Sequence, residues 1–148
     1  MKGPTGCRYL DDPRHANYVQ GGWNVTGDTY RLDADGYFTF VARSDDMIVS
    51  SGYNIAAPEV EAALHAHPAV AECAVVGVPC PERGQKVKAF IVAACGHEPG
   101  ATLASALQAH VKARIAPYKY PREVAFVAEL PKTATGKLQR FTLRHPAA

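Results

Sequence analysis

The 148-residue sequence contains no apolar run of about 18 residues, so it offers no candidate for a bilayer-spanning helix. It has no low-complexity tract and no internal repeat, which excludes fibrous and solenoid architectures. No Gly-x-Ser-x-Gly elbow is present, so a serine hydrolase triad is not supported. No two cysteines are separated by only two residues, so the usual zinc and redox spacings are absent and we expect no metal site.

The composition is that of an ordinary globular protein, with 47% hydrophobic and 20% charged residues. This is enough chain to bury a core without a disulfide or metal staple. Cys73 and Cys95 lie in apolar runs and are interpreted as small core residues. We therefore expect reduced thiols and a cytoplasmic location.

Positive charge is concentrated in the last quarter of the chain. Residues 1–111 carry a net charge of −4, and residues 112–148 carry +6. Such a segment favours an anionic partner, such as a nucleotide, CoA or nucleic acid, although a solvated basic face explains the same charges. No nucleic-acid motif is present, and the basic segment has few aromatic residues on which bases would stack.

Hydrophobic patterning predicts an α+β protein. Two hairpins are expected, at residues 30–41 around Asp33-Ala34-Asp35-Gly36 and at residues 47–55 around Ser50-Ser51-Gly52. Three main strands are expected at residues 70–78, 87–94 and 124–127, the first two paired and antiparallel; three helices are expected at residues 58–67, 101–115 and 138–143.

The predicted architecture is a small three-stranded sheet plus a β-hairpin, covered by helices. It is preceded by a remnant β-hairpin that has too few apolar residues for a core of its own. Residues 1–24 are rich in turn formers and are expected to be irregular. The polar run Arg43-Ser44-Asp45-Asp46 marks a boundary, which predicts one unit over residues 1–45 and another over residues 46–148.

The sharpest local feature is the polar segment from Pro131 to Lys137, in which Gly136 precedes the lysine. A glycine lets the backbone approach a phosphate while the ammonium adds charge. The segment is not a phosphate-binding P-loop, because Pro131 stands where that loop needs glycine and Leu138 follows the lysine. Taken alone, Lys137 is better interpreted as a solvated loop lysine.

Other polar positions have two interpretations each. Asp28 follows Gly27 and either binds a ribose diol or forms an Asx-type turn. Arg43 either faces a nucleotide beside a hinge or makes a surface ion pair with Asp45 or Asp46. The segment Ser50-Ser51-Gly52-Tyr53-Asn54 has a hairpin turn as its simpler interpretation.

Taken in order, these pieces resemble the late motifs of adenylate-forming enzymes, the superfamily of acyl-CoA synthetases, adenylation domains and luciferases. The match covers nearly the whole chain, and its finer details are most similar to benzoate and 2-aminobenzoate CoA ligases, through residues 18–31 and 116–122. The motifs are Thr26-Gly27-Asp28, Arg43-Ser44-Asp45-Asp46-Met47-Ile48, Ser51-Gly52-Tyr53-Asn54-Ile55, Pro58-Glu59-Val60-Glu61 and Pro131-Lys132-Thr133-Ala134-Thr135-Gly136-Lys137.

The resemblance implies a reaction in two steps. A carboxylate attacks the α-phosphate of ATP and releases pyrophosphate, and the CoA thiol then displaces AMP from the acyl adenylate. ATP with Mg²⁺ and CoA are the implied substrates, and no tightly bound cofactor is expected. The C-terminal domain of the family rotates between the two steps, so that one pocket assembles two catalytic arrangements.

The resemblance also assigns roles to residues. Lys137 matches the lysine of the adenylation step, whose cation stabilises negative charge on the reacting oxygens. Asp28 matches the carboxylate that holds the ribose hydroxyls, and Arg43 the arginine near the ribose. Asp45 matches the hinge, and Gly52 matches a glycine beside the pantetheine tunnel.

On charge alone, Lys119 and Arg122 are candidate contacts for the phosphates of CoA. The implied acyl pocket and phosphate-binding loop are not found here, so we expect a C-terminal portion that is inactive without an N-terminal domain. The alternatives are a carrier-protein adenylation domain and a non-catalytic fragment. The exposed edges of the first hairpin predict weak self-association.

Overall fold

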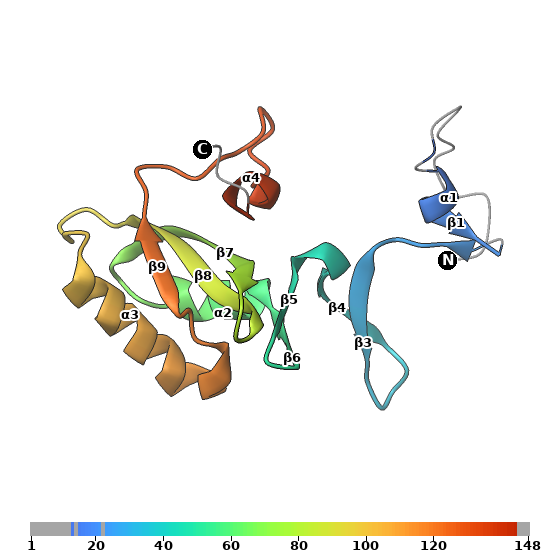
Figure 1. Ribbon diagram of the computed structural model, residues 1–148, viewed down its shortest axis with the longest axis horizontal. Helices are drawn as coiled ribbons and strands as arrows, with labels where there is room; N and C mark the ends of the chain where they lie inside the picture. The colour runs from blue at the N-terminus through green and yellow to red at the C-terminus, as the bar shows by residue number, and fades with distance from the viewer. Residues whose placement is uncertain (1–12, 14, 22, 145–148) are drawn as a thin grey trace. The chain divides into compact units, whose positions relative to one another are not determined.

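The computed structural model describes residues 13, 15–21 and 23–144 and divides the chain into two compact units, Met1–Asp45 and Asp46–Ala148 (Figure 1). Unit 2 contains one five-stranded sheet. None of the helices in the described part of the chain combines the length and apolar character needed to cross a membrane. The strands of the sheet are β5 (Met47–Ser50), β6 (Tyr53–Ala56), β7 (Val70–Cys80), β8 (Gly84–Ala93) and β9 (Glu123–Phe126).

Strand β8 is the centre of this sheet. Its whole length pairs with β7 in antiparallel register, from Val70↔Ala93 to Cys80↔Gly84. On its other side it pairs with β5 at Ser50↔Gly84 and, further along, in parallel with β9. Strand β7 therefore lies at an edge of the sheet.

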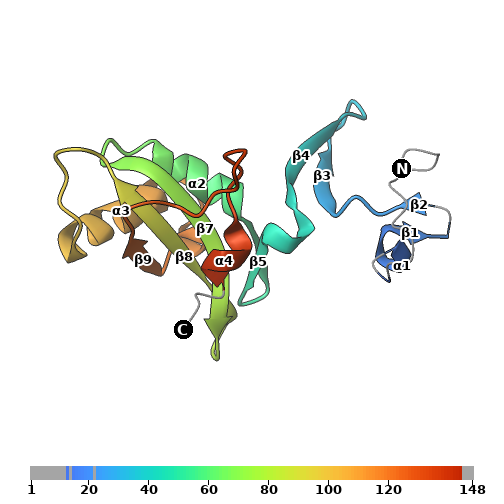
Figure 2. The same ribbon diagram turned by 90° about the horizontal axis from the view of Figure 1, so that it is seen from above.

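Side chains alternate between the two faces of the sheet, as the pleat of a β-strand requires. One face carries Val75 and Ile91 and is covered by α2 (Ala57–His65) and α3 (Ala101–Arg114), whose Leu64 and Leu107 are fully buried. The other face carries Ala74, Val76 and Phe90. Leu130, Leu138 and Leu143 pack there, the last of them on α4 (Arg140–Arg144), so the segment from 130 to 144 covers this second face (Figure 2).

The β5–β6 hairpin joins the sheet through a small set of polar contacts. Gln85 Oε1 accepts a hydrogen bond of 2.9 Å from the amide of Val49, and the amide of Ser51 donates to the carbonyl of Arg83 at 3.0 Å. Gly77 makes room for this Gln85 side chain, because a Cβ at Gly77 would lie 2.7 Å from Oε1. The expected hairpin and the expected three strands therefore form one continuous sheet.

The described residues of unit 1 form a short helix, two pairs of strands and a 3-10 turn at its end. Helix α1 (His15–Tyr18) leads into β1 (Val19–Gln20), which pairs with β2 (Trp23–Asn24), within a region expected to be irregular. The longer pair joins β3 (Asp28–Leu32) to β4 (Phe38–Arg43). Its Asp33 side chain accepts hydrogen bonds from the amides of Asp35 and Tyr37, which closes the predicted turn.

The α+β fold class is confirmed, and two further details differ from expectation. Cys73 is buried as expected, and burial raises the pKa of its thiol to about 12, but Cys95 is exposed in the turn after β8. Helix α2 ends at His65, so His67 lies beyond it. Cys7 lies outside the described residues.

Candidate functional site

Lys137 lies on a short, tightly closed hairpin loop. The amide of Thr133 donates to the carbonyl of Lys137 at 2.8 Å, and the amide of Gly136 donates to the carbonyl of Thr133 at 2.9 Å. Gly136 has a φ of +80°, which favours glycine at this position. The Thr133 hydroxyl accepts a further hydrogen bond of 3.0 Å from the Lys137 amide. The backbone of the loop is thus fixed from within.

The side chain of Lys137 is exposed. Over residues 13, 15–21 and 23–144, its ammonium has no ion-pair or hydrogen-bond partner. By contrast, Lys132, the other lysine of the loop, lies 2.7 Å from Glu72. Lys137 is therefore a cation on a backbone held by hydrogen bonds, and no carboxylate of the described residues neutralises its charge.

Asp28 and Arg43 come together in unit 1. They are direct partners in the β3–β4 pairing, and Arg43 Nη1 donates to Asp28 Oδ1 at 2.9 Å and to the carbonyl of Thr26 at 2.9 Å. The hydrogen bond to Asp28 raises the pKa of the Arg43 guanidinium. The contact leaves the second oxygen of the carboxylate available for other donors, as ribose recognition would need.

Gly27 has a structural role beside this pair. Its φ is +71°, and a Cβ there would lie 3.0 Å from Arg43 Nη2. Its carbonyl also accepts a hydrogen bond of 2.7 Å from the amide of Ser44. The Gly27-Asp28 pair therefore sets both the turn and the place of the guanidinium.

Asp45 is exposed in the short 3-10 helix η1 (Ser44–Asp46), and it is the last residue of unit 1. A hinge residue needs freedom to change its backbone angles, and an exposed side chain at a unit boundary meets that need. The hinge role of Asp45 stays a prediction.

Gly52 is in the two-residue turn between β5 and β6. Ser51 has a φ of +50° and Gly52 of +82°, the combination found in type I′ hairpin turns. Among the described residues, no atom lies within 4 Å of a Cβ built at Gly52, so within them only the backbone angle demands glycine. The turn is braced by a hydrogen bond of 3.0 Å from Arg83 to the Ser51 hydroxyl.

The two candidate CoA contacts have partners inside the chain. Lys119 Nζ lies 2.6 Å from Glu59 Oε1, with 17% of its side chain exposed, so a phosphate would compete with that carboxylate. Arg122 donates to the Tyr120 hydroxyl at 3.1 Å and lies over the same ring. Both assignments stay predictions. The rings of Tyr53 and Tyr118 stack with centroids 4.3 Å apart, which brings the Gly52 turn beside Lys119.

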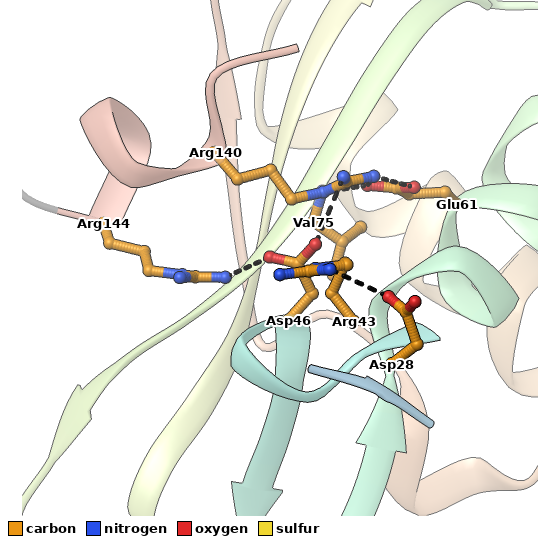
Figure 3. A network of polar contacts seen from close by, with 7 residues as sticks. All are labelled: Asp28, Arg43, Asp46, Glu61, Val75, Arg140 and Arg144. Carbon is orange, nitrogen blue, oxygen red and sulfur yellow. Dashed lines mark hydrogen bonds and ion pairs between the residues drawn. The ribbon is translucent and has the colours of Figure 1, made fainter. Parts of the chain in front are cut away.

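Sequence reasoning missed a cluster of ion pairs at the edge of β7 (Figure 3). Arg140 Nη2 lies 2.8 Å from Glu61 Oε2 and 3.0 Å from Oε1, while Arg140 Nη1 and Arg144 both approach Asp46. The sequence signal consists of two basic residues after Lys137, Arg140 and Arg144, and of two acids in the family motifs, Asp46 and Glu61. Their partners lie 79 to 98 residues away, beyond the reach of local patterns.

Comparisons with known proteins show the family to which the chain is related. Residues 59–137, more than half of the chain, match the family model of the AMP-binding enzyme C-terminal domain. The human mitochondrial acyl-coenzyme A synthetase ACSM5 is 57% identical over 140 residues, which are 92% of this chain and 24% of that protein.

Two crystal structures are similar in sequence and fold. The acyl-CoA synthetase of Brucella canis is 50% identical with a TM-score of 0.68, over 95% of this chain and 25% of that one. The anthranilate CoA ligase AuaEII, in complex with anthranoyl-AMP, is 47% identical with a TM-score of 0.77, over 89% of this chain and 26% of that one. The chain therefore spans about a quarter of the length of these relatives.

A family model that covers more than half of the residues, together with relatives at about half identity, decides the assignment. The chain belongs to the AMP-binding enzyme C-terminal domain family.

Proposed function

We propose that this chain is the C-terminal portion of an ATP-dependent, AMP-forming acid–CoA ligase. In the first step a carboxylate oxygen attacks the α-phosphorus of ATP, which enters as its magnesium complex, and the bond to the leaving pyrophosphate breaks. In the second step the CoA sulfur attacks the acyl carbon, and AMP leaves with the electron pair of the broken C–O bond. The products are a thioester, AMP and pyrophosphate.

The proposal rests on the surroundings of the Lys137 side chain and on the hydrogen bonds of its loop. Its ammonium has no carboxylate partner among the described residues and its loop backbone is fixed by internal hydrogen bonds. A preorganised cation is worth most where charge develops on oxygens in the transition state. In the adenylation step that charge lies on the carboxylate and the α-phosphate.

The remaining roles divide between the two units. In unit 1, Asp28 accepts hydrogen bonds from the ribose hydroxyls, Arg43 holds Asp28 and lies near the ribose, and Asp45 is the hinge. In unit 2, Gly52 lines the pantetheine tunnel. The basic charges near Lys119 meet the CoA phosphates once Glu59 is displaced.

We propose an aryl acid, benzoate or 2-aminobenzoate, as the carboxylate. Support comes from the sequence match over residues 18–31 and 116–122 and from the likeness to a ligase crystallised with anthranoyl-AMP. The curated relatives are named acyl-coenzyme A synthetases, so aliphatic acids are the competing class. We also propose a cytoplasmic location, whereas the names of these relatives place those proteins in mitochondria.

The test joins this chain to the N-terminal portion of the human relative in one polypeptide and measures AMP and thioester formation. We expect CoA-dependent thioester from the fusion and none from the 148-residue chain alone. Thioester formed only on a carrier protein would favour the adenylation-domain alternative. A fusion that binds ATP yet forms no AMP with any acid would favour a non-catalytic fragment.

The preference for aryl over aliphatic acids needs a separate experiment, because we expect the N-terminal portion to contribute to the choice of acid. The natural N-terminal portion of this protein, supplied with the chain, should turn over benzoate or 2-aminobenzoate faster than hexanoate or octanoate. A higher kcat/KM for the aliphatic acids would overturn the aryl assignment and leave the ligase proposal intact.

A further inference from the structure

Arg140 follows Lys137 by three residues and lies just after the loop between Lys132 and Leu138, which carries Lys137 and is called the lysine loop below. The loop is closed at its base by a bridge between Lys132 and Leu138 and by a hydrogen bond of 2.9 Å from the amide of Gln139 to the carbonyl of Pro131. The next residue, Arg140, begins α4. Whatever fixes Arg140 therefore fixes one of the two ends from which the lysine loop extends.

Arg140 is fixed by Glu61 across the edge of the sheet. Glu61 belongs to α2, which covers one face, and Arg140 belongs to α4 on the other, so their contact passes around edge strand β7 (Figure 3). Glu61 also accepts a hydrogen bond of 2.8 Å from the Val75 amide of that strand. The carboxylate thus joins α2, the sheet edge and the end of the lysine loop.

This contact has the features of a strong ion pair. The guanidinium meets Glu61 through Nε and Nη2, with distances of 3.3, 3.0 and 2.8 Å, and the two side chains are only 23% and 12% exposed. Planar contacts of this kind fix direction as well as distance, which a lysine does not reproduce.

The other end of the loop is held more weakly. Lys132 pairs with Glu72, but these side chains are 42% and 44% exposed, and exposed pairs add little to stability. The ion pair of Arg140 is less exposed than that of Lys132, so we expect Arg140 to contribute more to the orientation of the loop. Lys132 also provides a matched control, since it is a cation at the same loop whose acidic partner, Glu72, lies on β7, the strand whose Val75 amide donates to Glu61.

A second acceptor ties the same arginine to the start of unit 2. Arg140 Nη1 lies 3.5 Å from Asp46 Oδ2, and Arg144 binds the other oxygen of that carboxylate. Asp46 follows the proposed hinge residue Asp45 directly. The first residue of unit 2 and the lysine loop are therefore linked through two arginines.

We propose that Arg140 is a positioning residue for adenylation, which holds the Lys137 loop in its working orientation through Glu61 and Asp46. The inference rests on the proposed role of Lys137 and extends it. Arg140 touches no substrate in this account. Its loss should therefore slow the step that uses Lys137 and spare the step that does not.

The experiment compares two half-reactions in the fused enzyme. Adenylation is followed by acid-dependent exchange of pyrophosphate into ATP, and thioester formation is followed from a synthetic acyl adenylate and CoA. We expect Arg140→Gln to lower the exchange rate about 10- to 100-fold, the range for a misplaced catalytic group. Thioester formation should change less than threefold, a margin well inside the adenylation effect.

Three further variants make the result decisive. Glu61→Gln keeps an acceptor for the Val75 amide and should lower the exchange rate selectively, but less than Arg140→Gln does. This variant also tests the proposal if Arg140→Gln does not fold. Lys132→Gln should leave both half-reactions near the parent rates. Lys137→Ala is the reference for loss of adenylation alone.

The outcomes distinguish failure of the proposed function from failure of the positioning role of Arg140. If Lys137→Ala leaves exchange unchanged, the proposed function fails. If Lys137→Ala is selective but Arg140→Gln and Glu61→Gln are normal, or slow both half-reactions equally, only the positioning role of Arg140 is overturned.

Hydrogen exchange on the 148-residue chain gives a readout that needs no turnover. The amide of Gln139 donates to the carbonyl of Pro131 at the base of the loop, and the amide of Thr142 donates to the carbonyl of Gln139 at the start of α4. We expect these amides to exchange faster in Arg140→Gln and to keep their parent rates in Lys132→Gln. Equal rates in all three proteins would contradict the proposal.

Discussion

Arg43 and Asp28 face each other across the β3–β4 pair, with the guanidinium Nη1 2.9 Å from the carboxylate Oδ1. The pair is about half exposed on the arginine side, at 46%, so its contribution to stability is small. Its value lies in orientation, because the arginine fixes one carboxylate oxygen and leaves the other for a ligand. Nucleotide binding, rather than folding, should therefore respond when the pair is broken.

Asp28→Ala in the fused enzyme should raise the KM for ATP about tenfold or more, since a hydrogen bond to a charged group contributes about 1.5–3 kcal/mol. The melting temperature should change little. Asp35→Ala, in the exposed turn of the same hairpin, is the control and should leave the KM for ATP unchanged. An equal KM in the parent and in Asp28→Ala would remove Asp28 from the nucleotide site.

Gly52→Ala separates a structural need for glycine from a functional one. The added Cβ meets no atom within 4 Å, so the cost to folding is the backbone strain at a φ of +82°. That strain is about 1–2 kcal/mol for an ordinary residue. Gly96→Ala is the matched control, because Gly96 has a φ of +84° and the same open surroundings.

If Gly52 lines the pantetheine tunnel, Gly52→Ala should lower thioester formation from a supplied acyl adenylate and leave pyrophosphate exchange unchanged. Gly96→Ala should leave both reactions unchanged. Matching losses in the two variants would mean that strain alone is responsible, and the tunnel assignment would fail.

We expect His67 to make the stability of unit 2 depend on pH. Its Nδ1 accepts a hydrogen bond of 3.2 Å from the Ala69 amide, and its ring lies against His110 with centroids 4.9 Å apart. Burial, together with repulsion from His110, His97 and Arg114, lowers the pKa of His67. Between the lowered pKa and the ordinary value of about 6.5, the unfolded chain binds more protons than the folded one.

The contribution of His67 to the free energy of unfolding is therefore complete above about pH 6.5 and is lost as the pH falls through the lowered pKa. Urea titrations of the 148-residue chain at several pH values, followed by circular dichroism, measure this dependence. His67→Gln should flatten it, and His65→Gln, on exposed α2 surface, should not. A slope that is unchanged in His67→Gln would contradict the assignment.

The β3–β4 hairpin carries exposed aromatic residues on one face. Tyr30 makes edge contacts with Phe38 and Phe40, with centroids 6.4 and 5.9 Å apart, and the two phenylalanines remain 71% and 52% exposed. We expect the 148-residue chain to associate weakly, with a sedimentation coefficient that rises with concentration. The double change Phe38→Ser and Phe40→Ser should abolish that rise.

Phe141→Ser is the control for this measurement, because Phe141 is 63% exposed on α4 and far from the hairpin in sequence. It should associate like the parent. A sedimentation coefficient that does not change with concentration in the parent chain would show that the exposed aromatic face does not drive association.

The parts of the fold that depend on local pattern were predictable. The repeat of apolar residues from Leu103 to Ile115 predicts α3, and the turn signal around Gly36 predicts the first hairpin. The parallel pairing of β9 with β8 was not predictable, because no local signal records which strand is the neighbour. The same limit hid the attachment of the β5–β6 hairpin, which depends on Gln85 reaching Val49.

The candidate site also combines features that local sequence predicts with contacts between residues far apart in the sequence. The motifs that contain Asp28, Arg43 and Lys137 are contiguous stretches, so a resemblance finds them without coordinates. The partners of Lys119 and Arg140 are 60 and 79 residues away, and only the folded chain brings Glu59 and Glu61 to them. Charge alone therefore offered Lys119 as an unpaired cation, whereas the fold pairs it.

In the proposed function, Lys137 supplies the cation of the adenylation step. The most direct measurement is acid-dependent pyrophosphate exchange in the fused enzyme with Lys137→Ala, beside Lys132→Ala from the same loop. We expect the exchange rate to fall about 100-fold or more in Lys137→Ala, as for removal of one preorganised charge contact. The rate should change little in Lys132→Ala. An exchange rate in Lys137→Ala equal to that of the parent enzyme would contradict the account.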